Sequence, residues 1–313
     1  MRMDKPEPET LGAIGEGAIL GRIFTRLPHS ASTLLGPGDD AAVVAAPDGR
    51  FVVTTDMMVH GPDFRLAWST PFDLGWKAAA TNLSDVAAMG AVPTALVVAL
   101  AAPADTPVSF HERFADGLRE ACAELAPGCG VVGGDLSVSD TLTIAVTAFG
   151  DLETRAPVTR SGARVGDVVA VAGDLGLAGV GLRMLFENAP RDIAPLRGRV
   201  EVEAQLQPRP PIALGPIAAS AGATSMIDLS DGLALDASRV AAASGVAFAL
   251  HALSTDELDG GEDHALLATF SGGVPEGFRV IGAVVAGSGV LVDGHPYSSA
   301  GWDPFTGWDG SSS

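Results

Sequence analysis

Lysine is almost absent from this chain of 313 residues, in which only Lys5 and Lys77 carry an ammonium side chain. Acidic residues outnumber basic ones by 38 to 19, which gives a formal net charge of −19. A surface of this kind offers no basic stripe to bind nucleic-acid phosphates or anionic lipid. We therefore expect no nucleic acid and no membrane among its partners.

Cysteine is equally scarce. Cys122 and Cys129 do not suffice for a disulfide framework, and no Cys-x-x-Cys or Cys/His cluster indicates a zinc site. No apolar run reaches the roughly 18 residues of a transmembrane helix, and the first residues lack the apolar core of a signal peptide. These absences predict a cytoplasmic protein with two buried, reduced thiols.

The familiar nucleotide-site motifs are missing too. The sequence has no Gly-x-x-x-x-Gly-Lys-[Ser/Thr] loop, no Gly-x-Gly-x-x-Gly after a strand, and no kinase His-Arg-Asp or Asp-Phe-Gly. Lys77 falls within a predicted helix, so no lysine is placed in a phosphate loop. The six histidines are scattered without metal-binding spacing, which favours surface or core roles for each. If phosphates bind here, metal ions and backbone N–H groups must neutralise them.

What the chain does have is a mixed succession of apolar strands and amphipathic helices. Strands are expected near 40–46, 50–55, 93–102, 141–149, 167–173 and 279–287, with a further strand, turn and helix at 225–245. Helices are expected near 71–89, 108–125 and 176–186, the first opened by a capping box from Thr70 to Asp73. The length suits two domains, which we place at 1–152 and 153–313. The predicted class is α/β of the α+β type.

The two strands at 40–46 and 50–55 read as a β-hairpin around the turn Pro47-Asp48-Gly49. In that register Asp40 lies opposite Thr55, and Asp39 lies opposite Asp56. Opposed Cβ atoms are about 5 Å apart, so these acids repel one another unless a cation lies between them. Carboxylates with the hydroxyls of Thr54 and Thr55 form the all-oxygen set that Mg²⁺ prefers. The alternative is that each acid is an ordinary turn or cap residue.

Two further segments place acids where α/β folds bind ligands. In "IDLSDGL", Asp228 ends a strand, Ser230 is expected to cap the next helix and Asp231 to lie in its first turn. Such residues also stabilise a helix N-terminus by about 1 kcal/mol without any ligand. In "GGDLS", the glycines allow close backbone approach and Asp135 is a candidate metal ligand. On the predicted helix 71–89, Asp85 shares a face with small apolar residues, an unusual place for a carboxylate.

Taken in order, the motifs resemble those of one known family. They are "GDDAAVV", "TTDMMV", "NLSDVAAMGA", "GGDLS", "TRSGARVGD", "IDLSDGL" and "GGEDHAL". Together they resemble thiamine-monophosphate kinase, a family of the aminoimidazole-ribonucleotide synthetase-like ATP-binding proteins. The similarity runs from about Gly12 to Trp308, and its specificity lies in the ordered set.

The resemblance implies a two-domain fold whose N-terminal domain pairs across a homodimer in a barrel-like interface. It implies transfer of the γ-phosphoryl of ATP to thiamine monophosphate, the last step of thiamine diphosphate biosynthesis, with several Mg²⁺ ions. The implied metal ligands are Asp40, Thr54, Thr55, Asp56, Asp85, Asp135, Asp228 and Asp231. The implied ATP contacts are Gly134, Asp135, Arg160 and Ser230. The implied thiamine contacts are Glu262, Trp302 and, at a position where the family commonly has histidine, Asp63.

Physical chemistry is compatible with these implied roles. Phosphoryl transfer needs mainly positioning and charge neutralisation, which metal-bound carboxylates supply. The acceptor phosphate has a second pKa near 6, so it needs no general base. The thiazolium of thiamine is a permanent cation that suits the carboxylate of Glu262 and the face of Trp302, although ordinary packing would explain Trp302 equally well. The segment before Gly260 is shorter than the family leads us to expect.

Sister enzymes of the same architecture are the nearest alternatives. A selenophosphate synthetase should carry a reactive Cys in an N-terminal Gly-rich segment, and a hydrogenase-maturation relative should end in Cys. A ring-closing purine enzyme should carry a "GVGTK"-like segment where this chain has "VVTTDMMV". A noncatalytic acidic protein that binds Mg²⁺ or Ca²⁺ and leaves ATP intact is the alternative from another class.

Overall fold

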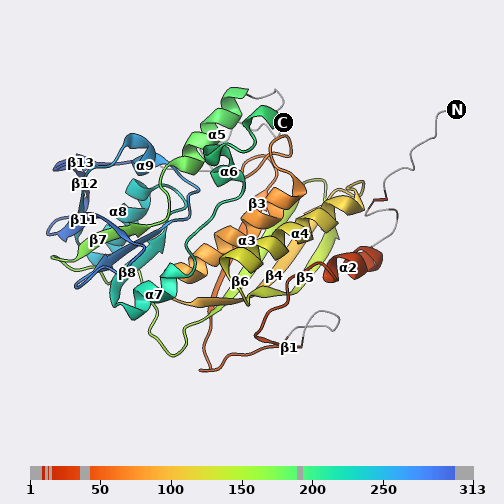
Figure 1. Ribbon diagram of the computed structural model, residues 1–313, viewed down its shortest axis with the longest axis horizontal. Helices are drawn as coiled ribbons and strands as arrows, with labels where there is room; N and C mark the ends of the chain where they lie inside the picture. Colours follow the sequence, from red (N-terminus) through yellow and green to blue (C-terminus); the bar gives the residue numbers. More distant parts are fainter. Residues whose placement is uncertain (1–8, 11–12, 14–15, 36–42, 189–192, 300–313) are drawn as a thin grey trace.

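The computed structural model describes residues 9–10, 13, 16–35, 43–188 and 193–299 and has a mixed α/β architecture (Figure 1). The helices are α2 (Glu16–Phe24), α3 (Pro71–Ala88), α4 (Val108–Leu125), α5 (Leu177–Asn188), α6 (Val200–Leu206), α7 (Leu214–Ser220), α8 (Leu233–Ser244) and α9 (Thr255–Asp259), with a 3-10 turn at Ala194–Leu196. The N-terminal strands are β1 (Thr33–Leu35), β2 (Val43–Val44), β3 (Val52–Val59), β4 (Val92–Ala102), β5 (Gly130–Val138) and β6 (Thr143–Asp151). The later strands are β7 (Val168–Ala172), β8 (Ala223–Asp228), β9 (Ala247–Leu250), β10 (Leu266–Phe270), β11 (Arg279–Val285), β12 (Gly289–Val292) and β13 (His295–Tyr297).

The N-terminal half is built on a four-stranded sheet with the order β3-β6-β4-β5. Helix α4 connects β4 to β5, and because such a crossover returns the chain to the same end of the sheet, these two strands are parallel. Side chains alternate along β6: Ile144, Val146 and Ala148 are buried, whereas the residues between them are half-exposed. Helices α3 and α4 cover only one face of this sheet (Figure 1).

Helix α3 is the central element of the fold. Its expected capping box is confirmed, since the Thr70 hydroxyl accepts from Asp73 N at 3.2 Å and the Asp73 carboxylate accepts from Thr70 N at 2.8 Å. Pro71 occupies the first turn, where its missing N–H is harmless. The helix contacts α4 and β6 on one side and β8 and α7 of the C-terminal half on the other. It therefore carries residues from the first sheet to the boundary with the second.

The C-terminal half is built on a seven-stranded sheet with the order β13-β12-β9-β11-β7-β10-β8. Its pairs are antiparallel except β12 with β9. The large hydrophobic core draws on both halves of the chain, and a second core lies under α8. The domain boundary expected after Leu152 falls between β6, the last strand of the smaller sheet, and β7, the first strand of the larger sheet along the chain. No helix in the described ranges is long and apolar enough to cross a membrane.

The predicted hairpin is wrong. In the described residues β2 pairs with β1, with Thr33 opposite Val44, and β3 pairs with β6, with Asp56 opposite Val146. The turn Pro47-Asp48-Gly49 therefore does not join paired strands, because β6 offers β3 eight partner positions and a hydrophobic helix-covered face. The acids Asp39 and Asp40 lie outside the described residues.

Two local expectations are also corrected. Helix α8 begins at Leu233 with Gly232 at its N-cap, so Ser230 does not cap it and Asp231 precedes its first turn. Gly232 has a φ of 114°, a conformation that favours glycine over any other residue. The "GGDLS" motif, for which the sequence indicated no particular element, lies within β5, paired with β4. Cys122 and Cys129 are buried free thiols, as expected.

Candidate active site at the junction of the two halves

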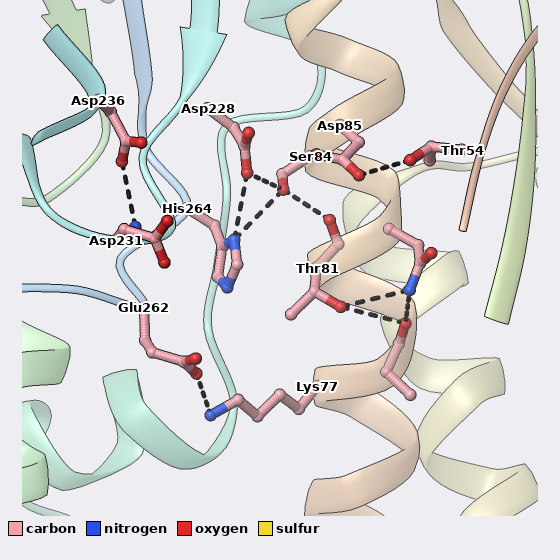
Figure 2. Close-up of polar contacts among 12 residues, drawn as sticks. Thr54, Lys77, Thr81, Ser84, Asp85, Asp228, Asp231, Asp236, Glu262 and His264 are labelled. Atoms are coloured by element: carbon pink, nitrogen blue, oxygen red, sulfur yellow. Dashed lines mark hydrogen bonds and ion pairs between the residues drawn. The ribbon is translucent and has the colours of Figure 1, made fainter. Parts of the chain in front are cut away.

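A polar stripe on α3 faces the C-terminal half (Figure 2). Lys77, Thr81, Ser84 and Asp85 recur at intervals that place them on one side of a helix. One turn is also tied to β3, because the side-chain oxygen of Asn82 accepts from Asp56 N at 3.1 Å. Helix α3 thereby fixes where the end of β8 and the middle of β3 lie relative to its own carboxylate, Asp85.

Three carboxylates gather around this stripe, and we call Asp56, Asp85 and Asp228 the acid cluster. The Thr54 hydroxyl donates to Asp85 Oδ2 at 2.7 Å, and the Ser84 hydroxyl lies 3.0 Å from Asp228 Oδ2 (Figure 2). Burial, with Asp228 and Asp56 adding repulsion, raises the pKa of Asp85 to about 7. Burial likewise raises the pKa of Asp56. The cluster is a set of oxygen donors that repel one another and would be stabilised by a cation.

His264 belongs to this site, although its sequence context predicted only a surface or core role. Its side chain is buried, and Nδ1 lies 3.4 Å from both Asp228 Oδ2 and Ser84 Oγ. Burial opposes protonation, but the hydrogen bond with Asp228 and the charge of Glu262 raise the pKa of His264. The same contact, acting against burial, lowers the pKa of Asp228. His264 therefore orients the Asp228 carboxylate.

Asp231 has a different partner. Its Oδ2 lies 2.7 Å from the Arg239 guanidinium, which also contacts Asp236 Oδ1 at 2.5 Å. Asp236 in turn accepts from Asp231 N at 3.1 Å, and burial raises the pKa of Asp236 to about 6. Asp231 is thus held in place by an arginine of α8. The Ser230 carbonyl accepts from Glu262 N at 2.7 Å, which joins this turn to the "GGED" segment.

An open groove of about 610 Å³ runs beside the acid cluster, and we call it the interdomain groove. Thr54, Asp85 and Asp228 line it together with Arg50 and Arg160. It combines carboxylate oxygens with guanidinium groups, which is a lining suited to a metal-bound polyphosphate. Arg50, which the sequence did not single out, contacts Asp48 at 2.7 Å.

A second cavity of about 190 Å³ lies at the other end of the stripe, and we call it the Trp68 pocket. Its walls include Trp68, Phe186, Asp63 and Glu262. The Asp63 carboxylate accepts from Val59 N at 2.7 Å, and burial raises its pKa. Carboxylates beside aromatic rings form a lining that accepts a flat organic cation.

The structure does not bring all expected residues together. Thr55 lies on the uncovered face of the sheet, where its hydroxyl lies 3.2 Å from Thr147 Oγ1, while Thr54 and Asp56 face α3. Gly134 and Asp135 lie on β5, the opposite edge strand from β3, and Asp135 is exposed with a hydrogen bond from Ser137 at 2.8 Å. Asp40 and Trp302 lie outside the described residues.

Within those residues, no three Asp, Glu, His or Cys side chains already converge tightly enough to hold a metal ion. The donor chemistry nevertheless fits Mg²⁺. This ion keeps several waters and is bound in proteins by one or two carboxylates plus substrate phosphates rather than by a full protein cage.

Comparison with known proteins defines the class of protein first. The family model described as "AIR synthase related protein, N-terminal domain" matches residues 38–152. A crystal structure of thiamine-monophosphate kinase from Stenotrophomonas maltophilia superposes with a TM-score of 0.75 at 29% identity, covering 90% of this chain and 96% of that one. The chain therefore has the two-sheet α/β fold of the AIR synthase-related proteins.

The particular family follows from closer relatives. Thiamine-monophosphate kinase of Mycobacterium tuberculosis is 46% identical over 96% of this chain and 94% of its own length. A structure of AaThiL complexed with AMPPCP and TMP matches at a TM-score of 0.72 and 33% identity, over 84% of this chain and 90% of that one. The chain belongs to the thiamine-monophosphate kinase family.

Proposed function

We propose that this protein transfers the γ-phosphoryl group of ATP to thiamine monophosphate, yielding thiamine diphosphate and ADP. The observation that carries the proposal is the position of the acid cluster. Asp85 and Asp228 line the interdomain groove, while Lys77, on the same helix as Asp85, and Glu262 line the Trp68 pocket. A groove suited to a polyphosphate and a pocket suited to an organic cation thus lie along one helix.

Mg²⁺ would be held by oxygens of Asp56, Asp85 and Asp228, with Asp40 and Thr54 as further proposed ligands, and when bound it would neutralise the charge of the phosphates. Thr54 and Ser84 hold two of these carboxylates in fixed orientations through hydrogen bonds of 2.7 and 3.0 Å. Arg160 contributes a guanidinium to the groove, where it suits a phosphate oxygen. Ser230 remains a proposed nucleotide contact and Asp231 a proposed metal ligand.

No general base is needed for the reaction. The acceptor is a phosphate monoester with a second pKa near 6, so its attacking oxygen is largely ionised at pH 7. The residues of the site then have two tasks, which are to align the two phosphates and to neutralise the charge that would keep them apart.

The Trp68 pocket is proposed to bind the thiamine moiety. Asp63 and Glu262 supply negative charge for the thiazolium, and Trp302 remains a proposed further contact. Trp68 and Phe186 already pack against the Arg65 guanidinium, which lies 4.9 Å from each ring centroid. Because Arg65 also lines the pocket and already engages these rings, the proposed binding of the thiazolium relies on the two carboxylates.

We further propose a homodimer that completes the site. The uncovered face of the four-stranded sheet exposes Val53 and Met57, whose side chains are 54% and 63% accessible. Met57 on β3 and Asp135 on β5 lie in the same row of paired residues across the sheet. They are separated by three inter-strand spacings, or about 14 Å. If two copies close into an eight-stranded barrel, β5 of one copy lies beside β3 of the other. Asp135, which shares the uncovered face with Met57 and Thr55, would then approach Thr55 of the other copy, the sequence neighbour of Asp56.

This arrangement also gives the two expected domains distinct tasks. Residues 1–152 would supply Asp56 and Asp85 of the acid cluster and the dimer interface, and residues 153–313 would supply its third member, Asp228. Residues 153–313 would supply Arg160, the turn at Ser230 and the Glu262 wall of the pocket. Both halves would have to stay packed together for the reaction to occur.

The test is an assay of purified protein with Mg²⁺, ATP and thiamine monophosphate, following ADP and thiamine diphosphate by chromatography. We expect stoichiometric formation of both products, and its loss when EDTA removes the metal. Hydrolysis of ATP without a diphosphate product would indicate a different acceptor. Binding of Mg²⁺ with ATP left intact would refute the kinase assignment and favour a noncatalytic metal-binding protein.

A further inference from the structure

Lys77 is a buried ammonium group beside the Trp68 pocket, with only 7% of its side chain exposed. Burying an unpaired ammonium costs several kcal/mol, so its partners matter. The Lys77 Nζ forms an ion pair with the Glu262 carboxylate and donates to the Gln205 carbonyl at 3.2 Å (Figure 2). One side chain thus joins α3, α6 and the "GGED" segment around the pocket.

The two members of the ion pair are not equally accessible. The Glu262 side chain is 36% exposed, whereas that of Lys77 is almost fully covered. Both side chains line the pocket, and the carboxylate is the more accessible group for an entering ligand. Burial alone would raise the pKa of Glu262, but the charge of Lys77 lowers it below its usual value.

The backbone of Glu262 is also constrained. Its φ is 67°, in the left-handed region that a residue with a side chain adopts at a cost of about 1 to 3 kcal/mol. The conformation is held by the hydrogen bond of 2.7 Å from Glu262 N to the Ser230 carbonyl. The main chain is fixed by Ser230 and the carboxylate by Lys77, so the acid is oriented from both ends.

We propose that Lys77 is a positioning residue, which holds the Glu262 carboxylate where the cationic ring of the acceptor binds and which acts only through Glu262. This inference rests on the proposed function, because it assigns Glu262 to the thiamine moiety. Lys77 itself touches neither phosphate in this account. A neutral side chain at position 77 would leave Glu262 free to rotate out of the pocket.

The decisive experiment compares Lys77→Met, Lys77→Arg, Glu262→Gln and the double variant Lys77→Met/Glu262→Gln. We expect Lys77→Met to raise the KM for thiamine monophosphate at least tenfold, with the KM for ATP and kcat changed less than about threefold. Lys77→Arg should recover part of the loss, since it keeps the charge but places it differently. Arg113→Met, which removes an exposed guanidinium from α4, is the matched control and should change neither constant.

The double variant separates an indirect role from a direct one. If Lys77 acts through Glu262, the double variant should have the acceptor KM of Glu262→Gln alone. If the effects of the two single substitutions on the acceptor KM were additive in the double variant, the proposal would be overturned, because Lys77 would then contact the ligand itself. An unchanged acceptor KM in folded Lys77→Met would overturn it as well. If Lys77→Met does not fold, the double variant can still be compared with Glu262→Gln, because it buries no unpaired charge.

Failure of this inference is distinguishable from failure of the proposed function. The wild-type protein must first form thiamine diphosphate, and absence of this product would refute the function before Lys77 is considered. A wild-type enzyme that turns over normally, beside a Lys77→Met variant with normal acceptor KM, would refute only the role of Lys77.

Discussion

At the scale of single residues, Asp85 shows what crowding does to a carboxylate. It lies on α3, which contacts strands of both sheets, and the neighbouring Asp56 and Asp228 oppose its ionisation. The Thr54 hydroxyl and the charge of His264 act in the opposite direction. A carboxylate in this position costs folding energy while it is unpaired and would be stabilised by a bound cation.

Asp85→Asn should therefore separate activity from stability. We expect kcat to fall by about two orders of magnitude or more, because a proposed metal ligand loses its charge. The Tm of the metal-free protein should stay equal or rise, because like-charge repulsion is relieved. Steady-state kinetics and calorimetry in EDTA measure the two effects. Asp105→Asn, at an exposed loop acid, is the control, and a large drop in Tm for Asp85→Asn would contradict this account.

At the scale of elements, the crossing of α3 and α4 depends on two glycines. A Cβ on Gly75 would overlap the Phe114 carbonyl oxygen, and a Cβ on Gly117 would overlap the Phe72 carbonyl oxygen. The two helices therefore approach each other closely through these reciprocal contacts. This close packing helps to fix the position of Asp85 on α3 relative to β3.

Gly117→Ala should destabilise the protein by about 2 to 4 kcal/mol, because the helix backbones must separate. Gly21→Ala on α2, where an added Cβ meets open space, is the matched control and should be neutral or stabilising by up to about 1 kcal/mol. Denaturant unfolding of the two variants gives the comparison. Equal stabilities would show that the crossing tolerates a wider separation.

The N-terminus of α3 depends on another buried acid. Asp73 accepts from Arg197 at 2.6 Å and from the Gln207 amide at 2.5 Å, in addition to its capping role. Although burial opposes ionisation, these contacts lower the pKa of Asp73 below its usual value. Its ionised form therefore ties α3 to the segment around α6.

Asp73→Asn should lower the free energy of unfolding by about 2 kcal/mol at pH 7, since it leaves Arg197 without its charge partner. Because the folded-state pKa lies below that of the unfolded chain, Asp73 adds stability above about pH 4 and loses it as the pH falls through the folded-state value. The difference between wild type and variant should therefore shrink towards pH 3. Glu153→Gln, which removes an exposed ion pair with Arg155, should show a difference of less than about 0.5 kcal/mol at every pH.

At the scale of the whole molecule, the described part of the chain covers the four-stranded sheet on one side only (Figure 1). Its two edge strands, β3 and β5, carry predicted site residues that a single chain keeps on opposite edges. The exposed apolar side chains between them suit a second copy. The proposed site would then take Asp56 from one protomer and Asp135 from the other.

Complementation between two inactive variants tests this sharing. Asp56→Asn and Asp135→Asn should each be nearly inactive, but a mixture allowed to exchange subunits should recover about a quarter of wild-type activity, because half the dimers then contain one intact site. A mixture that stays inactive despite demonstrated exchange would place both residues in the same protomer's site. Light scattering on the wild-type protein checks that dimers form.

The sequence motifs predicted part of the candidate site, and the structure revealed the rest. The motifs around Asp56, Asp85 and Asp228 predicted that these acids act together, and the structure brings them into one cluster. Lys77, Ser84 and His264 were missed. The spacing of Lys77 and Ser84 from Asp85 on α3 was a usable signal, whereas His264 becomes a site residue only because β8 and β10 pair beside α3.

Local chemistry by itself determined the helices α3, α4, α5 and α8, the capping box and the strands β3, β4 and β6 of the first sheet, because periodicity and turn residues act over a few positions. It also determined which acids and glycines form the ordered motifs of the family. Tertiary structure alone decided that β3 pairs with β6 instead of with its sequence neighbour β2. It alone decided that Lys77 reaches Glu262 and that Thr54, rather than Thr55, faces α3. These outcomes depend on contacts between residues far apart in the sequence, whose energies no local pattern contains.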